Sequence, residues 1–387
     1  MRFFAPMTRW RFLLSALMFL CCTACGSSTS LTVAATAVES GNVDNLQVPS
    51  GFHVSLFAHN LTAPRFIAFS PDGTLFAAER GTGRILAFLD AKHTGQPSAT
   101  VVVADGLNDP TSVFFASGSL YVGVADGVIK MTVGPDLHST STQQIISGLP
   151  VGGNHSTRTV LVGTDGRIYV SIGSTCNDCI ETDALRATVM VFAADGSNGR
   201  IFASGIRNAV GMAINPWTGA TWVTDNGRDN LGDNLPPDTI YQLQDGGNYG
   251  WPRCHAGTII DPDLGHPGDC TGIIAPLVNL QAHSAPLGLA FYHQNKIQNQ
   301  FPSSYQGMYV AFHGSWNRTV PTGYKVVFIP MDASGKVSGS PQDFLTGTAA
   351  VQGQVTGRPV GVVAGPDGAL YVSTDQGGSI YRITYGK

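Results

Sequence analysis

The stretch GNHSTRTVLVGTDGRIYVSIG, residues Gly153–Gly173, contains the pattern that decides the fold of this chain. A polar start is followed by an apolar run, a turn built on Thr-Asp-Gly, and a second run rich in β-branched and aromatic residues. Such runs on either side of a Gly-containing turn are typical of two paired strands. The stretch therefore predicts part of a small sheet, with polar side chains at the beginning of its first strand.

The same pattern occurs six times along the chain, with a polar residue or a proline ahead of each first run. The six first runs are Pro64–Phe69, Asp109–Phe115, His155–Val162, Arg207–Ile214, Ser284–Tyr292 and Arg358–Ala364. Long repeats that each contain paired β-runs are typical of β-propellers, in which every repeat forms one blade. The sequence predicts an all-β protein, a six-bladed β-propeller of four-stranded antiparallel blades over residues 46–387.

The composition agrees with a turn-rich β protein and excludes some functions. The 387 residues include 47 glycines and 22 prolines, and only 12% of the residues are charged. No segment of the mature chain has the periodicity of a helix. The net charge is −4 and there is no block of basic residues. We therefore do not expect nucleic acid as a partner, because phosphate binding requires clustered positive charge.

The N-terminus has the features of a targeting segment. Three arginines precede a short apolar core, Phe12–Cys22, which is too short to span a bilayer. The residues Cys22–Gly26 resemble a bacterial lipobox. Residues 1–24 are therefore predicted to be a lipoprotein signal peptide and Cys25 to carry a lipid anchor, with ordinary secretion as the alternative. Residues 25–45 are predicted to be a flexible tether, and the protein is expected to be exported, periplasmic and anchored to the outer membrane.

Four cysteines lie in the predicted propeller: Cys176, Cys179, Cys254 and Cys270. An exported protein meets an oxidising compartment, where disulfides are the expected state of cysteines. Local pairing, Cys176–Cys179 and Cys254–Cys270, is the simplest of the three connectivities, and a four-cysteine zinc site is the alternative. Isoleucine rather than histidine follows Cys179, so the first pair does not form a haem attachment motif.

The inner strands of a propeller begin close to its central axis, so polar residues at those positions should meet there. They are Arg65, Thr111, His155, Arg158, Arg207, Asn208, His283 and Arg358. A histidine titrates near neutral pH and can accept a proton from a hydroxyl group, although a structural role is the alternative for His155. Buried arginines need negative partners. They indicate either an anionic ligand, such as a polycarboxylate or phosphate, or pairing with aspartates of neighbouring strands.

Two loops carry polar groups suited to a ligand. Asn226–Asp238 contains several aspartates, and hard oxygen ligands suit calcium, although an acidic surface loop is the alternative. His313–Arg318, HGSWNR, offers Trp316 for stacking on a planar ring, and a polar loop with one packed tryptophan is the alternative. The chain has no Gly-x-Ser-x-Gly elbow and no Gly-x-Gly-x-x-Gly motif after a strand in a βαβ context. A nicotinamide cofactor is therefore not expected.

In this order, the motifs resemble those of the glucose/sorbosone dehydrogenase family. They read GNHSTRTVLVGTDGRIYVSIG, GIRNAVGMAI, NGRDNLGDNLPPD, GGNYGWP, HGSWNR and GRPVGVVAGPDGALYVSTD. The resemblance covers roughly Val48–Ile383 and is closer to the sorbosone and pyranose branches than to soluble glucose dehydrogenase. It implies a propeller that binds pyrroloquinoline quinone (PQQ) and Ca2+. It also implies oxidation of a sugar or aldose, sorbosone-like or pyranose-like, to a lactone or acid.

The resemblance also implies roles for individual residues. His155 corresponds to the catalytic base, which removes the hydroxyl proton while hydride passes to PQQ. The family residues that contact the cofactor correspond to Arg207, Asn208 and Arg358. The calcium ligands correspond to the backbone carbonyls of Gly227 and Arg228. The other predicted cofactor-binding residues are Arg158, Trp316, Asn317 and Arg318, of which the two arginines would replace a lysine that the glucose branch has and this chain lacks.

Two positions depart from the glucose branch, because Val210 replaces a glutamine and Val360 an arginine. These departures argue against glucose as the substrate. The chain has no haem motif, so we expect a separate electron acceptor, a cytochrome or a membrane quinone. Two other interpretations fit a propeller. A calcium-dependent lactonase-type hydrolase would need carboxylates in the central channel. A non-catalytic propeller that binds a glycan or a peptide would tolerate the two departures.

Overall fold

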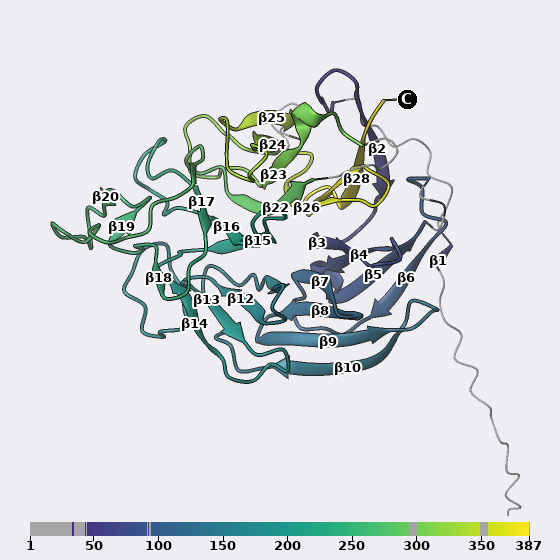
Figure 1. The fold of residues 1–387 in the computed structure, drawn as a ribbon, viewed down its shortest axis with the longest axis horizontal. Coiled ribbons are helices and arrows are strands. Elements are labelled where there is room, and N and C mark those ends of the chain that lie inside the picture. Colours follow the sequence, from purple (N-terminus) through teal and green to yellow (C-terminus); the bar gives the residue numbers. More distant parts are fainter. Residues whose placement is uncertain are drawn as a thin grey trace, which may run out of the picture. The chain divides into compact units, whose positions relative to one another are not determined.

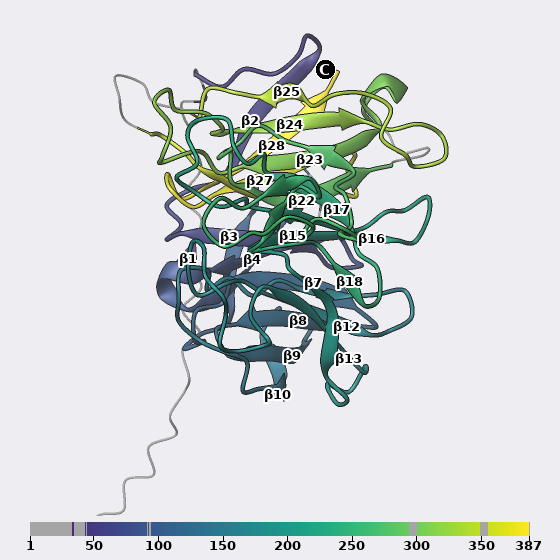
Figure 2. The same ribbon diagram turned by 90° about the vertical axis from the view of Figure 1, so that its left-hand side faces the viewer.

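Six antiparallel sheets surround a central axis in the computed structural model, and each sheet corresponds to one of the six sequence repeats (Figure 1). The prediction of a six-bladed β-propeller is confirmed. The inner strands contact one another in cyclic order, from blade one through blade six and back to blade one. Blade five (β22–β25) and blade two (β7–β10) lie on opposite sides of the ring (Figure 2).

The structure describes residues 33–34, 43, 45–90, 92, 94–293, 300–348 and 355–386, all within one structural unit, Val33–Lys387. The predicted signal peptide, the predicted anchor Cys25 and most of the predicted tether lie outside the described residues. No helix in the described part of the chain has the length and apolar character needed to span a bilayer. Its only helical turns are two short 3-10 segments, η1 (Arg80–Thr82) and η2 (Ser303–Tyr305).

The strands of each blade follow the chain from the axis outwards. Blade one has β3 (Pro64–Phe69), β4 (Leu75–Glu79), β5 (Arg84–Leu89), β6 (Ala99–Ala104) and, at its edge, β1 (Val33–Ala34). Blade two has β7 (Ser112–Ala116), β8 (Ser119–Val124), β9 (Gly127–Val133) and β10 (Ser139–Ile146). Blade three has β11 (Val160–Val162), β12 (Ile168–Ile172), β13 (Thr188–Phe192), β14 (Arg200–Ser204) and a short parallel strand, β18 (Gly247–Asn248).

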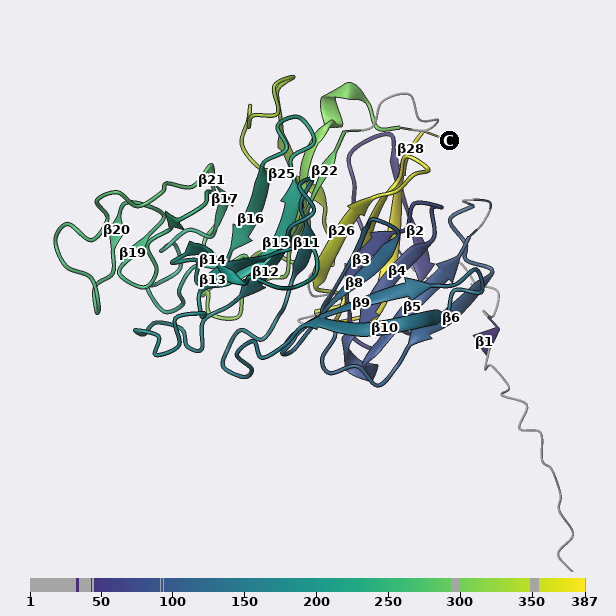
Figure 3. The ribbon, with the colours of Figure 1, turned by 60° about the horizontal axis from the view of Figure 1, so that its bottom comes forward.

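The second half of the ring is built in the same way. Blade four has β15 (Ala209–Ile214), β16 (Thr221–Asp225), β17 (Thr239–Gln242) and β21 (Val278–Asn279). Blade five has β22 (Pro286–Tyr292), β23 (Gly307–Phe312), β24 (Lys325–Pro330) and β25 (Gln342–Leu345). Blade six has β26 (Pro359–Ala364), β27 (Leu370–Thr374), β28 (Ser379–Tyr385) and β2 (Phe52–Ala58). A separate hairpin, β19 (Cys254–His255) and β20 (Ile259–Ile260), extends outwards beside blade four (Figure 3).

Apolar packing between blades holds the ring together. Six buried clusters occur, one between each pair of neighbouring blades. The middle strands are covered on both faces, so every residue of β4 and of β12 is buried. The outer strand β10 is mostly exposed, and its STSTQQ sequence is polar. Burial of apolar area at about 25 cal/mol per Å2 makes these interfaces the main stabilising contribution.

Strand β2, which comes early in the chain, pairs with β28, the last strand, and completes blade six. Phe52 of β2 makes edge-to-face contacts with Phe301, Phe344 and Tyr385. The ring is therefore closed by hydrogen bonds and aromatic packing between the two ends of the propeller.

The loops between the second and third strands divide the ring into two halves. In blades three, four and five these loops are long and cover residues 173–187, 226–238 and 313–324. In blades six, one and two they are short and cover residues 375–378, 80–83 and 125–126. The long loops surround the candidate site described next.

Candidate active site

A cavity of about 110 Å3 lies at the end of the ring where the inner strands begin. Its lining comes from the beginnings of the inner strands of blades three to five and from the long loops of blades four and five. The lining residues are His155, Arg207, Asn208, Asn226, Gly227, Asp229, Asp238, His283, Ala285, Gly314, Trp316 and Asn317. We call this space the axial cavity. It brings together the predicted base, the Arg-Asn pair, the predicted calcium loop and Trp316, which is 72% exposed at the rim.

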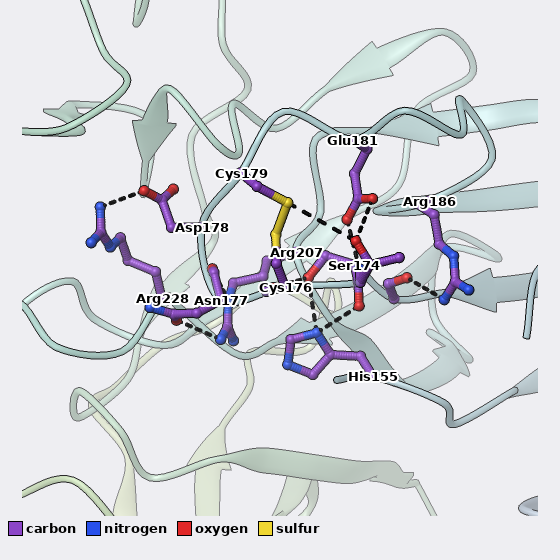
Figure 4. Close-up of a disulfide and its surroundings, with 12 residues drawn as sticks. His155, Ser174, Cys176, Asn177, Asp178, Cys179, Glu181, Arg186, Arg207 and Arg228 are labelled. Carbon is purple, nitrogen blue, oxygen red and sulfur yellow. Dashed lines mark hydrogen bonds and ion pairs between the residues drawn. A yellow bond between two sulfur atoms is a disulfide. The ribbon is translucent and has the colours of Figure 1, made fainter. Parts of the chain in front are cut away.

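His155 enters the axial cavity just ahead of β11 with one ring nitrogen fixed by Ser174. Nδ1 lies 2.8 Å from Ser174 Oγ and 3.1 Å from the Ser174 carbonyl oxygen (Figure 4). The Ser174 hydroxyl donates its own hydrogen to the carbonyl oxygen of Cys176 at 2.7 Å. Both groups facing Nδ1 are therefore acceptors, so Nδ1 carries the proton. Nε2, which bonds to none of the described residues, is left as the proton acceptor.

The surroundings of His155 keep its imidazole neutral. Burial lowers the pKa of His155 to about 3, and the positive charges of Arg207 and then Arg186 act in the same direction. At neutral pH the imidazole can therefore accept a proton without first losing one. A base with so low a pKa is weak in the empty site, and a bound anion nearby would raise its pKa.

Arg207 is buried, and all of its nitrogens are hydrogen-bonded. Nε donates to the carbonyl oxygen of Asn177 at 2.8 Å, and Nη1 donates to that of Asn226 at 3.1 Å. Nη2 donates to Asn177 Oδ1 at 2.8 Å and to Asp229 Oδ2 at 3.0 Å. The other oxygen of Asp229 accepts from Asn317 at 3.0 Å. Both alternatives considered for the arginines meet here, because Arg207 pairs with an aspartate and also lines the axial cavity.

The loop predicted to bind calcium is fixed by two buried aspartates. Asp238 accepts from the backbone nitrogens of Gly227 at 2.8 Å and Ala285 at 2.9 Å. Asp225 accepts from the backbone nitrogen of Asn208 at 2.8 Å. Burial raises the pKa of both carboxyl groups to about 7. The carbonyl oxygens of residues 227 and 228 accept no hydrogen bond from any residue that the structure describes, so both are available to a cation.

The side chain of Arg228 points away from the axial cavity into a group of carboxylates. Its guanidinium group contacts Asp178 at 2.9 Å, Asp263 at 3.0 Å and also Asp261. Three acidic partners leave no role for this side chain with an anionic ligand. Only the backbone of residue 228 can take part in the site, as the sequence analysis proposed.

Three arginines predicted to contact a cofactor do not line the axial cavity. Arg158 is fully buried and donates to the carbonyl oxygens of residues 150, 156 and 157. Arg318 donates to those of residues 233, 282 and 320. Arg358 donates to those of residues 313 and 314, at 3.0 and 2.7 Å. All three stabilise loops around the site, and direct contact with a cofactor stays a prediction for them.

Arg65 pairs with an aspartate of a neighbouring blade, which is the second of the two roles considered for the axial arginines. Its Nη1 lies 2.6 Å from Asp375, and Asp375 also contacts His313 at 2.9 Å. These groups come from blades one, six and five and contact one another, although Arg65 Nε has no partner among the described residues. Arg65 is therefore a structural residue.

The two positions that depart from the glucose branch belong to an apolar cluster. Val210 and Val360 are buried and pack with Leu287 and Phe66, and we call these four residues the floor cluster. Along the inner strands they lie between the axial cavity and a larger apolar cavity of about 500 Å3 lined by later residues of the same strands. The valines therefore close the bottom of the site and leave no unsatisfied polar group.

Both predicted disulfides are present, Cys176–Cys179 and Cys254–Cys270. The sequence analysis did not connect the first of them with the site, and it overlooked Ser174 and Asn177. A signal was available, because Ser174 follows β12 as Asn226 follows β16 and His313 follows β23. The repeats that identified polar residues at the beginnings of the first strands would equally have identified polar residues after the ends of the second strands.

The TrAA12-like family model matches residues 46–263 and 266–386. The chain is 30% identical over 377 residues to an uncharacterized protein of Borreliella burgdorferi, covering 93% of this chain and 95% of that protein. It is 27% identical over 406 residues to a pyrroloquinoline quinone-dependent pyranose dehydrogenase of Coprinopsis cinerea, covering 87% of this chain. The chain spans about half the length of that enzyme, 54%.

Solved structures show the same likeness. The holo form of the pyranose dehydrogenase PQQ domain from Coprinopsis cinerea superimposes with a TM-score of 0.75 at 26% identity, covering 88% of this chain and 97% of that one. A calcium structure of a Trichoderma reesei enzyme of carbohydrate-active family AA12 gives a TM-score of 0.77 at 20% identity, covering 88% and 97%. The second likeness shows the shared fold.

Proposed function

Because the chain belongs to the TrAA12-like family, we propose that it is a PQQ-dependent dehydrogenase that oxidises a sugar or aldose, sorbosone-like or pyranose-like, to a lactone or acid. The observation that carries the proposal is the axial cavity itself. A neutral imidazole there presents an unprotonated nitrogen, and Arg207 and Gly227 line the same cavity. The carbonyl oxygens of residues 227 and 228 accept no hydrogen bond from the described residues. The same motif order was the basis of the family resemblance in the sequence.

The lining suits an anionic cofactor accompanied by a cation better than an anion alone. Arg207, Asn208 and Asn317 offer N–H donors to carboxylate or quinone oxygens. Asp229 also lines the cavity and its carboxylate would repel an anion, as would Asp238 once it ionises above its raised pKa of about 7. A divalent cation would offset that repulsion. Asn317 Oδ1 is buried without a partner among the described residues, which leaves it for a ligand. We therefore propose Ca2+ on the carbonyls of residues 227 and 228.

PQQ supplies an electrophilic quinone that takes two electrons from the substrate, and Ca2+ beside it would strengthen that electrophile. The protein's own contribution is positioning and proton transfer. His155 Nε2 accepts the proton of the sugar hydroxyl, and the charge that develops on the ring is stabilised through Nδ1–H by Ser174. Arg207 and Asn208 orient negatively charged groups, and the floor cluster keeps water from entering the site from below.

We further propose that electrons leave to a separate cytochrome or membrane quinone, because the sequence has no haem attachment motif. Export to the periplasm and a lipid anchor at Cys25 are proposed on the N-terminal sequence alone.

The test is reconstitution of the purified chain with PQQ and Ca2+, followed by a screen of aldoses with a dye acceptor. We expect dye reduction that depends on PQQ, on calcium and on at least one aldose. Cleavage of lactones or esters without PQQ would instead support a hydrolase. PQQ binding without oxidation of any aldose, or no PQQ binding at all, would contradict the proposal and favour a non-catalytic propeller.

A further inference from the structure

The four-residue loop closed by the disulfide Cys176–Cys179 contacts the polar groups of the axial cavity from one side. We call it the disulfide loop. The carbonyl oxygen of Cys176 accepts from Ser174, which in turn faces His155. The backbone and side chain of Asn177 accept two hydrogen bonds from Arg207, both at 2.8 Å. One short loop therefore contacts both Ser174, which fixes His155, and the buried guanidinium group of Arg207 (Figure 4).

The same loop also reaches the predicted calcium loop of the next blade. Asn177 Oδ1 accepts from the backbone nitrogen of Asp229 at 2.7 Å, and Asn177 Nδ2 donates to the carbonyl oxygen of Asp229 at 3.2 Å. Asp178 Oδ2 pairs with Arg228 at 2.9 Å. Residues 228 and 229, one of which carries a proposed metal-binding carbonyl, are thus held from blade three as well as from blade four. Within blade four and its insertion, Asp229 pairs with Arg207 and Arg228 pairs with Asp261 and Asp263.

The base of the disulfide loop is itself fixed. Glu181 accepts from the backbone nitrogen of Thr175 at 2.6 Å and from its hydroxyl at 2.7 Å. The backbone nitrogen of Asn154, one residue before His155, donates to the carbonyl oxygen of Thr175 at 2.9 Å. A Cβ on Gly173 would approach the Cβ of His155 to 2.4 Å, so the two segments are in close backbone contact.

The geometry points to the disulfide loop as the positioning element of the active site. We propose that closure by Cys176–Cys179 holds Ser174 so that His155 keeps its Nδ1–H tautomer, and holds Asn177 so that Arg207 and Asp229 keep their places. Opening the loop then impairs turnover through the imidazole and the guanidinium group, although neither cysteine touches the substrate. The expected loss of turnover rests on the proposed function, whereas the expected effect on the tautomer of His155 does not.

The second disulfide provides a matched control. Cys254–Cys270 closes the insertion that contains β19 and β20, and no residue between these cysteines lines the axial cavity. Its removal loses a covalent cross-link of the same kind, and chain-entropy arguments assign the longer loop the larger contribution to stability. A general effect of losing a disulfide would therefore be at least as large in the control.

The experiment compares the full chain with the variants C176S/C179S and C254S/C270S. The 15N signals of labelled histidine, with His155 assigned from His155→Gln, report which ring nitrogen carries the proton in the protein without cofactor. We expect Nδ1–H in the wild type and in C254S/C270S, and a mixture containing Nε2–H in C176S/C179S. With PQQ and Ca2+, we expect kcat of C176S/C179S to fall about tenfold or more. The pH dependence of kcat that reports His155 should also move towards pH 6.5. The reason is that Arg207, which lowers the pKa of His155, is no longer held beside the ring, while Arg186 still lowers this pKa.

A folded C176S/C179S that keeps Nδ1–H and a kcat within about twofold of the wild type would overturn the proposal. If this variant does not fold, Ser174→Ala tests the same link with the disulfide intact, and Ser373→Ala is its control. Ser373 is a buried serine of blade six that accepts from Gly361 and donates to the carbonyl oxygen of Arg65. Ser174→Ala keeps the carbonyl oxygen of residue 174 as an acceptor for Nδ1–H, so we expect a partial shift towards Nε2–H and a several-fold lower kcat, and only in this variant. No change in either quantity would again overturn the proposal.

The two proposals fail separately. If the wild type oxidises no aldose, the proposed function is wrong, and the histidine signals still decide whether the disulfide loop fixes the tautomer. If the wild type is active and the signals are the same in all variants, the positioning role is wrong and the dehydrogenase stands.

Discussion

The two halves of the ring use the same position of the repeat in different ways. Blades three, four and five place His155, Arg207 and His283 at the beginnings of their inner strands, and all three line the axial cavity. Blades six and one place Arg358 and Arg65 there, and neither lines it. Arg358 is satisfied by loop carbonyls, and Arg65 by Asp375.

The difference follows from the loops and not from the residue at the strand beginning. In blades four and five the long loops 226–238 and 313–324 bring their own polar groups to the axial cavity, and the blade-three loop 173–187 contacts His155 and Arg207 from the side. In the other half the short loops let the axial side chains reach each other directly. The charged residues at the strand beginnings therefore line the axial cavity in blades three to five, whereas in blades six and one they bond to other protein groups.

The largest expected effect is on His155, in the half that lines the cavity. Replacement with alanine removes the proton acceptor and should lower kcat by about 10²- to 10⁴-fold while PQQ still binds. Steady-state kinetics and PQQ titration measure both quantities. His313→Gln is the control, because His313 does not line the axial cavity and its side chain contacts Asp375 of blade six, so kcat should stay within a few-fold of the wild type. Near-normal turnover in a PQQ-loaded His155→Ala protein would remove the imidazole from the mechanism.

The next largest effect is expected for a pair of arginine variants, one from each half of the ring. Arg207→Gln should lower kcat/KM by about 10- to 100-fold, because the cavity loses its buried positive charge and Asp229 loses its partner. Arg65→Gln should lower the free energy of unfolding by about 3–5 kcal/mol, since it breaks a buried ion pair, with little change in kcat/KM. Kinetics and denaturant unfolding separate the two. Equal losses of activity in both would mean that the halves are not functionally distinct.

Two aspartates should respond to pH in different windows. Burial raises the folded-state pKa of Asp225 to about 7, so ionising it lowers the stability of the folded protein as pH rises from about 4 to 7. Relative to the wild type, Asp225→Asn should therefore become more stable across that range. Hydrogen bonding and charge from His313, together with the charge of Arg65, hold the pKa of Asp375 well below its usual range despite burial. The stability it contributes is present above about pH 4 and is lost below, so Asp375→Asn should show a constant deficit above pH 4 that shrinks in acid.

These curves are obtained from denaturant unfolding of the protein without cofactor between pH 2.5 and about 8. A relative stability of Asp225→Asn that does not change with pH would contradict the assignment of a raised pKa to this carboxyl group.

The smallest expected effect on activity concerns the floor cluster, which both halves share. Val360→Ala should lower the free energy of unfolding by about 1–3 kcal/mol through the cavity it leaves, with KM and kcat nearly unchanged. Thermal unfolding and kinetics test this. A large change in KM without loss of stability would show that Val360 contacts the ligand.

The sequence was sufficient for the ring and for much of the site. Repetition predicted the six blades, and His155, Arg207, Asn208, Gly227, Trp316 and Asn317 line one cavity as the motifs indicated. It was less informative about Arg158, Arg318 and Arg358, because a repeat fixes where a strand begins but not which carbonyls a neighbouring loop offers to a long side chain. It also gave no reason to connect a pair of cysteines with the tautomer of a histidine, since that link passes through a serine hydroxyl and a single carbonyl.

The pairing of β2 with β28 has a consequence for how the chain is made. The strand that completes blade six is synthesised near the beginning of the propeller, and its partner is synthesised last. Blades two, four and five are each built from one stretch of the chain, yet the circle stays open until both ends of the propeller are present. Truncating the last strand should therefore leave an open arc with an unpaired sheet edge at each end, the kind of edge on which other chains aggregate.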